Sequence, residues 1–379
     1  MSVVPGGAPL GSRRLLSTGL LIGAAAIILV SGISTASSLD LYGWDFRHQY
    51  YGGAMSVIQG EPLYPSPDEV VFDGIPAYVY PPLTAVALLP VTILPEDVAV
   101  VLAVVAALGA VMAALALVGV RDVRCYAAVL ASAPAWNLAE TANLSALLVL
   151  GIAVAWRLRA TVWPLAVTLG LAVSAKLLLW PLLVWAIATR RHRAAALAAA
   201  VGLGATFAAW AAIGFQGLTA YPALLERLDD VWAEESLSIV GMAAALSLDP
   251  AIGLVLTLIV GGVLLVACFR LGRRGDDRRS FTCAIAAALA LTPIVWVHYV
   301  AYLLVPLGLA RPRFSAIWLL PMVLWASPRS GNGDGLDPTP RSFLVALVVL
   351  VLLVVLLARP RDEAPFLQAL GTEGFPTPS

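Results

Sequence analysis

The chain has 379 residues, of which 60% are hydrophobic and 12% are charged, and its mean hydropathy is +0.91. Soluble globular chains are about half apolar and about a quarter charged. Because so few charges cannot cover a water-facing surface, the composition excludes an ordinary soluble protein and predicts an all-α polytopic membrane protein.

The formal net charge is zero, yet basic and most acidic residues occupy different stretches of the chain. Since positively charged loops remain in the cytoplasm, we place the arginine clusters inside, which puts 18 of the 23 basic residues there. Arg270–Arg279 is then an ordinary membrane anchor, and no nucleic-acid partner is predicted. The acidic stretches, placed outside, are Asp40–Asp97, Glu226–Asp249 and Asp334/Asp337.

In chain order, an apolar stretch at 15–36 follows Arg13 and Arg14. It lacks a clear cleavage site and many apolar runs follow, so we read it as a retained first span that leads to an extracytoplasmic loop at 37–95. A second extracytoplasmic segment is expected at 214–250. The other single spans are predicted at 98–119, 194–213, 251–269, 314–327 and 342–358.

Three segments have basic residues at both flanks and must therefore return to the side from which they start. They lie between Arg124 and Arg157, at 160–189 and at 281–310. Each leg of such a hairpin has roughly 13–17 residues, or about 20–25 Å of helix, which is less than the roughly 30 Å of the hydrocarbon core. Polar residues at the turns are therefore expected to line one outward-facing cavity.

The count is about twelve membrane segments in a single domain, 1–361, followed by a cytoplasmic tail at 362–379 that is predicted to be disordered. The three cysteines, Cys125, Cys268 and Cys283, lack the spacing of metal ligands and are read as small buried hydrophobes. No cofactor or metal site is predicted, and the metal requirement stays open.

The first external loop carries the most informative polar residues. Tyr50, Ala54, Val57 and Ile58 follow one another at helical spacing, which predicts a short amphipathic helix on the membrane surface that ends at Gly60. Asp45 precedes this helix. By position alone, Asp45 is at least as well explained as a helix cap or a solvated carboxylate as it is by catalysis.

Several motifs together resemble glycosyltransferase family 87, which consists of polyprenol-phosphate-sugar-dependent enzymes of the GT-C fold, including actinobacterial mannosyltransferases. The opening motifs and the last one resemble the family most specifically, and the middle three are weaker because residues are missing or shifted. The motifs are Asp45-Phe-Arg47, Tyr50-Tyr-Gly-Gly-Ala54, Gly60-Glu-Pro-Leu-Tyr64, Tyr80-Pro-Pro-Leu83, Ala142-Asn143, Ala175-Lys176 with Pro181, Glu235-Ser-Leu237 and Thr292-Pro-Ile-Val-Trp296-Val-His298-Tyr299.

The resemblance implies that Asp45 is the general base of a single inverting displacement and that His298 contacts the donor phosphate or orients the acceptor. Lys176 is the only lysine in the chain. At a recessed turn it needs a partner, either the donor phosphate or a carboxylate such as Glu140 or Glu235. His298 could instead be satisfied by the backbone.

Three further residues are candidates for substrate binding. Arg47 and His48 could meet the phosphate or lipid headgroups, although a solvated loop explains them equally well. Asn143 is more often a helix cap than a sugar ligand, and Tyr80 lies in an aromatic–proline motif that leads back to the bilayer.

The resemblance therefore implies a plasma-membrane enzyme with an extracytoplasmic active site. It would pass a hexose, with mannose favoured, from a polyprenyl-phosphate sugar to a glycolipid or lipid-linked glycan. Two alternatives stay open: a same-family arabinofuranosyltransferase, and a non-enzymatic polyprenyl-lipid flippase or transporter. Transporters usually show paired halves with interrupted spans, whereas the largest polar feature here is a single loop near the N-terminus.

Overall fold

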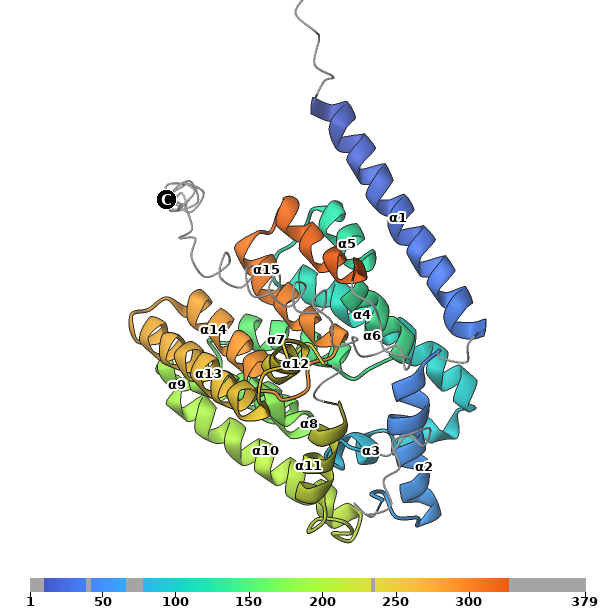
Figure 1. Ribbon diagram of the computed structural model, residues 1–379, viewed down its shortest axis with the longest axis vertical. Helices are drawn as coiled ribbons and strands as arrows, with labels where there is room; N and C mark the ends of the chain where they lie inside the picture. The colour runs from blue at the N-terminus through green and yellow to red at the C-terminus, as the bar shows by residue number, and fades with distance from the viewer. Residues whose placement is uncertain (1–9, 39–41, 66–77, 233–235, 327–379) are drawn as a thin grey trace, which may run out of the picture.

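The structure is a computed structural model that describes residues 10–38, 42–65, 78–232 and 236–326 (Figure 1). Over these residues the chain forms helices and turns and no strand. In chain order the helical elements are α1 Leu10–Ser38, η1 Phe46–Tyr51, α2 Gly52–Gln59, α3 Leu83–Ala87, η2 Leu89–Ile93, α4 Glu96–Leu117, α5 Val123–Leu130, α6 Ala133–Thr141, α7 Ser145–Arg157, α8 Val162–Ala175, η3 Leu177–Leu179, α9 Pro181–Ala188, α10 His192–Ala212, α11 Tyr221–Trp232, α12 Ile239–Ala245, α13 Pro250–Arg273, α14 Asp277–Ala290, η4 Val297–Leu303, α15 Leu304–Ala310 and η5 Ala316–Ala326.

Three of the predicted single spans correspond to the long helices α4, α10 and α13. Among the described residues these are the helices long and apolar enough to cross a membrane, and the bent pair α6–α7 makes a fourth if it is counted as one span. The total of about twelve segments stays a prediction. The span at 342–358, the tail at 362–379 and the motif residue Glu235 lie outside the described residues.

Each predicted hairpin consists of helical elements that meet near the expected turn. Helices α6 and α7 are bent by 120° at residues 142–144. Helix α8 ends at Ala175, and η3 and α9 follow directly after Lys176. Helix α14 ends at Ala290, and η4 and α15 resume the path at Val297.

The long helices expose large apolar side chains, as expected of surfaces that face lipid. On α10, Leu203 is 73% exposed and Phe207 is 66% exposed, and α13 exposes Leu258 and Val263 to a similar degree. Helix α14, in contrast, is buried from Ser280 to Ala290 and lies inside the bundle against α13 and α9. The bundle therefore has an apolar exterior around an equally apolar core, which is the arrangement of an integral membrane protein.

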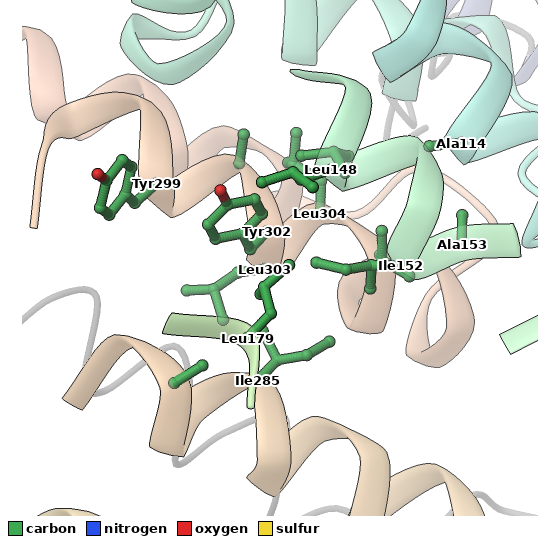
Figure 2. Close-up of a cluster of buried hydrophobic side chains, with 14 of the residues drawn as sticks. Ala114, Leu148, Ile152, Ala153, Leu179, Ile285, Tyr299, Tyr302, Leu303 and Leu304 are labelled. Atoms are coloured by element: carbon green, nitrogen blue, oxygen red, sulfur yellow. The ribbon is translucent and has the colours of Figure 1, made fainter. Parts of the chain in front are cut away.

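Small residues allow the helices to approach one another closely, which matters where lipid is as apolar as the core. Helices α8 and α10 show this best: a Cβ atom added at Gly170 would lie 2.6 Å from the backbone oxygen of Ala198, and one at Gly202 would lie 3.1 Å from the oxygen of Gly170. The core itself is built from α4 to α10 and from α13 to η5. Figure 2 shows Leu148, Ile152 and Leu179 near the ring of Tyr302 of η4, with Ile285 on the neighbouring helix and the ring of Tyr299 at the side of the cluster.

An ion-paired cluster ties three helix connections together at the predicted cytoplasmic end. Asp277, at the start of α14, accepts hydrogen bonds from the guanidinium of Arg191 at 2.7 and 3.0 Å and from the indole of Trp185 at 2.7 Å. Arg159 lies 3.2 Å from the same carboxylate. Arg159 on the α7–α8 connection and Arg191 on the α9–α10 connection thus share the carboxylate of Asp277 on the α13–α14 connection, which ties these three connections together.

The helix expected after Asp45 is present and begins as the π-helix η1 before it continues as α2. It ends at Gly60, whose φ of +71° is the left-handed conformation that glycine adopts without a steric penalty. This helix and its end at Gly60 confirm the local interpretation of the loop, while the position of the helix on the membrane surface stays a prediction.

The three cysteines are buried and free, as predicted.

Candidate active site

Five of the seven predicted site residues come together at the end of the bundle opposite the Asp277 cluster. They come from segments far apart in the chain: the residue before η1, the stretch before α3, the α6–α7 turn, the residue after α8 and η4. We refer to them as the polar cluster, which consists of Asp45, Tyr80, Asn143, Lys176 and His298.

Asp45 is held by a side chain rather than by the start of its own helix. It makes no capping hydrogen bond to η1, so the helix-cap interpretation is wrong. Its Oδ2 instead accepts a 2.5 Å hydrogen bond from Nδ2 of Asn143. Asp45 as a whole residue is partly buried, and its carboxylate lies against the α6–α7 turn.

The electrostatic environment of Asp45 has opposing contributions. Burial is the largest and raises the pKa of the carboxyl above its ordinary value, whereas the hydrogen bond from Asn143 and the attraction of Lys176 lower it. The net pKa is raised. A carboxylate with a raised pKa is a stronger proton acceptor than an ordinary aspartate, as a general base requires.

Asn143 acts both as a helix cap and as a site residue. Its Oδ1 accepts from the backbone N–H of Ser145 at 2.8 Å, at the beginning of α7, and this fixes the amide so that Nδ2 points to Asp45. Nδ2 also lies 3.3 Å from the hydroxyl of Tyr80. The cap predicted from the sequence is therefore what orients the amide toward the carboxylate.

The turn that carries Asn143 is fixed by contacts from the first loop. Ala142 adopts a positive φ of 49°, an unusual conformation for a residue with a Cβ atom. The backbone N–H of Leu144 donates to the hydroxyl of Tyr50 at 3.2 Å, and the N–H of Gly43 donates to the carbonyl of Glu140 at 2.6 Å. The first loop thus holds the α6–α7 turn at its backbone as well as through Asp45.

Lys176 is 6% exposed and lies between aromatic faces. Its Nζ is 3.9 Å from the ring centre of Tyr299 and 5.3 Å from that of Tyr80, and it donates to Oγ of Ser145 at 3.1 Å. Within the described part of the chain no carboxylate lies within 4 Å of this ammonium, and the predicted alternative of an ion pair with Glu140 does not form. Glu235 lies outside the described residues.

His298 is 1% exposed and has one ring nitrogen held in place. Its Nδ1 is 2.8 Å from Oδ1 of Asn137. Since an amide oxygen only accepts, Nδ1 carries the hydrogen, and Nε2 is the atom that can accept or, when protonated, donate. Among the described residues Nε2 has no hydrogen-bond partner, so the backbone does not satisfy it.

Arg47 and His48 do not join the polar cluster. The guanidinium of Arg47 binds Glu96 at 3.0 Å and Asp97 at 2.8 Å, so it links η1 to the beginning of α4. The ring of His48 packs edge-on against Trp44 at 4.2 Å between ring centres.

Sequence reasoning did not single out Tyr50, Asn137, Ser145 and Tyr299 as site residues. Tyr50 and Tyr299 stood inside quoted motifs, and Ser145 follows Asn143 at the start of an apolar helix, so these three carried a local signal. Asn137 lies in the predicted hairpin between Arg124 and Arg157, near an expected turn, but its contact with His298 could not be predicted because it joins residues 161 positions apart.

The polar cluster brings a base-like carboxylate together with a buried cation that has no carboxylate within 4 Å among the described residues. A model of glycosyltransferase family 87 matches residues 78–297, more than half of the chain. The chain belongs to glycosyltransferase family 87. No curated protein and no solved structure matches it.

Membership of family 87 makes this protein a membrane glycosyltransferase. The matched range contains Tyr80, Asn143 and Lys176 of the polar cluster. Asp45 lies before it and His298 directly after it. Asp45 joins the cluster through its hydrogen bond with Asn143, and His298 through Tyr299, whose ring contacts both His298 and Lys176.

Proposed function

We propose that this family 87 enzyme transfers a hexose from a polyprenyl-phosphate sugar to a glycolipid or lipid-linked glycan, with inversion, on the extracytoplasmic face of the plasma membrane. Mannose is the first sugar to test. The observation that carries the proposal is that one cluster contains a carboxylate, Asp45, and a buried ammonium, Lys176, which has no carboxylate within 4 Å among the described residues.

The environment of Lys176 favours an anionic ligand. A buried charge is destabilising unless it is paired or hydrogen-bonded. The ring faces of Tyr80 and Tyr299 and one serine hydroxyl stabilise the ammonium only in part, because each is weaker than a close ion pair. A lipid phosphate would complete its coordination, and the attraction would grow as negative charge accumulates on the leaving phosphate.

The proposed reaction is one displacement. Asp45 accepts the proton of the acceptor hydroxyl as its oxygen attacks the anomeric carbon of the donor sugar. The bond between that carbon and the phosphate oxygen breaks, and its electron pair leaves with the polyprenyl phosphate. Lys176 stabilises the departing phosphate, and Nε2 of His298 orients the acceptor hydroxyl by accepting its hydrogen bond or, when the ring is protonated, donates to the phosphate.

The decisive experiment supplies membranes that contain the protein with radiolabelled polyprenyl-phosphate mannose, glucose and arabinofuranose, and follows the label into extractable glycolipid. We expect transfer from a hexose donor. Transfer from the arabinofuranose donor alone would assign the protein to the arabinofuranosyltransferase alternative. A flippase would transfer no label in any sample and would only move the lipid between leaflets.

Variants connect the activity to the cluster. Lys176→Met should lower the transfer rate by about 100-fold or more if the ammonium acts on the leaving phosphate, as for other single electrostatic contacts in active sites, while the melting temperature in detergent changes little. Arg47→Met is the comparison, because it removes a nearby cation that is already paired with two carboxylates. A greater loss in Arg47→Met than in Lys176→Met would place the phosphate at Arg47 and contradict the assignment.

A further inference from the structure

Three tyrosine hydroxyls bind three consecutive backbone carbonyls beside the polar cluster. Tyr221 donates to the carbonyl of Val79 at 3.0 Å, Tyr64 to that of Tyr80 at 2.8 Å, and Tyr78 to that of Pro81 at 2.8 Å. We refer to Tyr64, Tyr78 and Tyr221 as the tyrosine clamp. Tyr64 and Tyr78 belong to the first loop, and Tyr221 is the first residue of α11.

The sequence of the clamped stretch explains why it needs outside donors. Residues 79–82 form no regular element, and α3 begins only at Leu83. Pro81 and Pro82 carry no N–H, so neither can donate a backbone hydrogen bond to the carbonyl of a residue before it. The carbonyls of Val79 and Tyr80 are therefore satisfied by side chains, and buried carbonyls left unpaired would be strongly unfavourable.

The three clamp rings are themselves packed. Tyr64 lies 5.6 Å from Tyr78 and 5.2 Å from Tyr221, measured between ring centres, and stacks on Trp210 of α10 at 5.2 Å. Gly217 allows the external segment to pass close to this group, because a Cβ atom there would lie 2.9 Å from the ring of Tyr64. The clamp is thus a rigid aromatic block between α10, α11 and the first loop.

The side chain in the middle of the clamped stretch faces the polar cluster. The ring of Tyr80 lies 5.3 Å from Nζ of Lys176 and 5.1 Å from the ring of Tyr50, and its hydroxyl accepts from Asn143. A shift of the backbone at residue 80 would change all three contacts, since only two side-chain torsions separate the ring from the backbone.

We propose that Tyr64, Tyr78 and Tyr221 are positioning residues that hold Tyr80 against Lys176 and Asn143, so that the external segment containing α11 forms part of the active-site wall. This inference rests on the proposed function. Since a small displacement of a group that orients a substrate lowers the rate of the chemical step, the clamp should act on turnover more than on donor binding.

The test uses phenylalanine variants, which keep the ring and remove only the hydroxyl. We expect Tyr221→Phe and Tyr64→Phe to lower kcat about 5- to 10-fold, with the KM for the donor and the melting temperature nearly unchanged. Tyr126→Phe is the matched control, because it removes a hydroxyl that donates to the carbonyl of Val120 at 2.7 Å, far from the clamp. Tyr78→Phe is less suitable, since this hydroxyl also accepts from the N–H of Ala85.

A second measurement does not depend on transfer. 3-Fluorotyrosine at position 80 reports the environment of the ring by ¹⁹F NMR, and its signal should shift or broaden in Tyr221→Phe but stay unchanged in Tyr126→Phe. If the wild type transfers no sugar, the proposed function fails, while the NMR comparison still decides whether the clamp positions Tyr80. An unchanged signal and kcat in both clamp variants would overturn the inference, as would a loss of kcat that only follows the loss of folded protein.

Discussion

Replacement of Asp45 by asparagine removes the proton acceptor and keeps the shape of the side chain. The amide oxygen of the new residue can still accept the hydrogen bond that Nδ2 of Asn143 now donates to the carboxylate. The α6–α7 turn should therefore keep its position, and the effect on transfer reports the base itself.

The two expected effects of Asp45→Asn differ widely in size. Loss of a general base lowers the rate by about 10²- to 10⁴-fold, which corresponds to about 2.7–5.4 kcal/mol of transition-state stabilisation. On stability, a neutral hydrogen bond replaces a charge-assisted one, a loss of about 1 kcal/mol. Removal of a carboxylate that burial destabilises offsets this loss, so we expect the melting temperature to stay within about 3 °C.

The pH dependence gives an independent test with a defined sign. Because the pKa of Asp45 is raised in the folded protein, the protonated form is favoured there relative to the unfolded chain. The stabilisation due to this proton is complete below the unfolded pKa of about 3.9 and is lost as the pH rises through the higher folded pKa. The acid limb of kcat/KM should therefore lie above about pH 3.9. Asn143→Ala removes a hydrogen bond that lowers this pKa, and should move the limb to higher pH.

The assay measures label transfer and melting temperature on the same detergent preparations. Near-wild-type transfer by Asp45→Asn would refute the assignment of this residue as the base. A large fall in melting temperature together with a proportional loss of transfer would show that the carboxylate is needed for folding instead. An acid limb that stays in place in Asn143→Ala would contradict the electrostatic description of the site.

Three further predictions concern the scaffold. Asp277→Ala removes an acceptor shared by two guanidinium groups and an indole, and should lower the free energy of unfolding by about 2–3 kcal/mol, seen as a lower melting temperature. Gly170→Ala should lower the free energy of unfolding by about 1–3 kcal/mol, because the added Cβ atom would lie 2.6 Å from a backbone oxygen. Gly204→Ala is the control: its Cβ atom would meet nothing within 4 Å, so the melting temperature should stay the same or rise. In intact cells, Gln216→Cys should react with an impermeant maleimide added from outside, and His192→Cys should not. The unsubstituted protein, whose three native cysteines are buried, gives the background. Labelling of His192→Cys but not of Gln216→Cys would show that the predicted topology is inverted.

Hydrophobicity and charge are local properties, so the sequence by itself determined much of the scaffold. Long apolar runs predicted α4, α10 and α13, and the arginine clusters predicted turns near the ends of α6, α8 and α14, of which the α6–α7 turn is bent by 120°. The left-handed end of α2 at Gly60 was also predictable, since glycine has no Cβ atom and adopts that conformation without a steric clash. The motifs further indicated the family, which the family comparison confirmed.

Only the tertiary structure decided which candidates share a site, because their contacts join residues far apart in the chain. Arg47 and Asp45 are two positions apart, yet Arg47 pairs with Glu96 and Asp97 while Asp45 meets Asn143, 98 positions away. Tyr221 reaches the carbonyl of Val79 across 142 positions. Such pairings depend on how the helices pack, and side-chain packing at close range leaves no periodic pattern in the sequence from which it could be read.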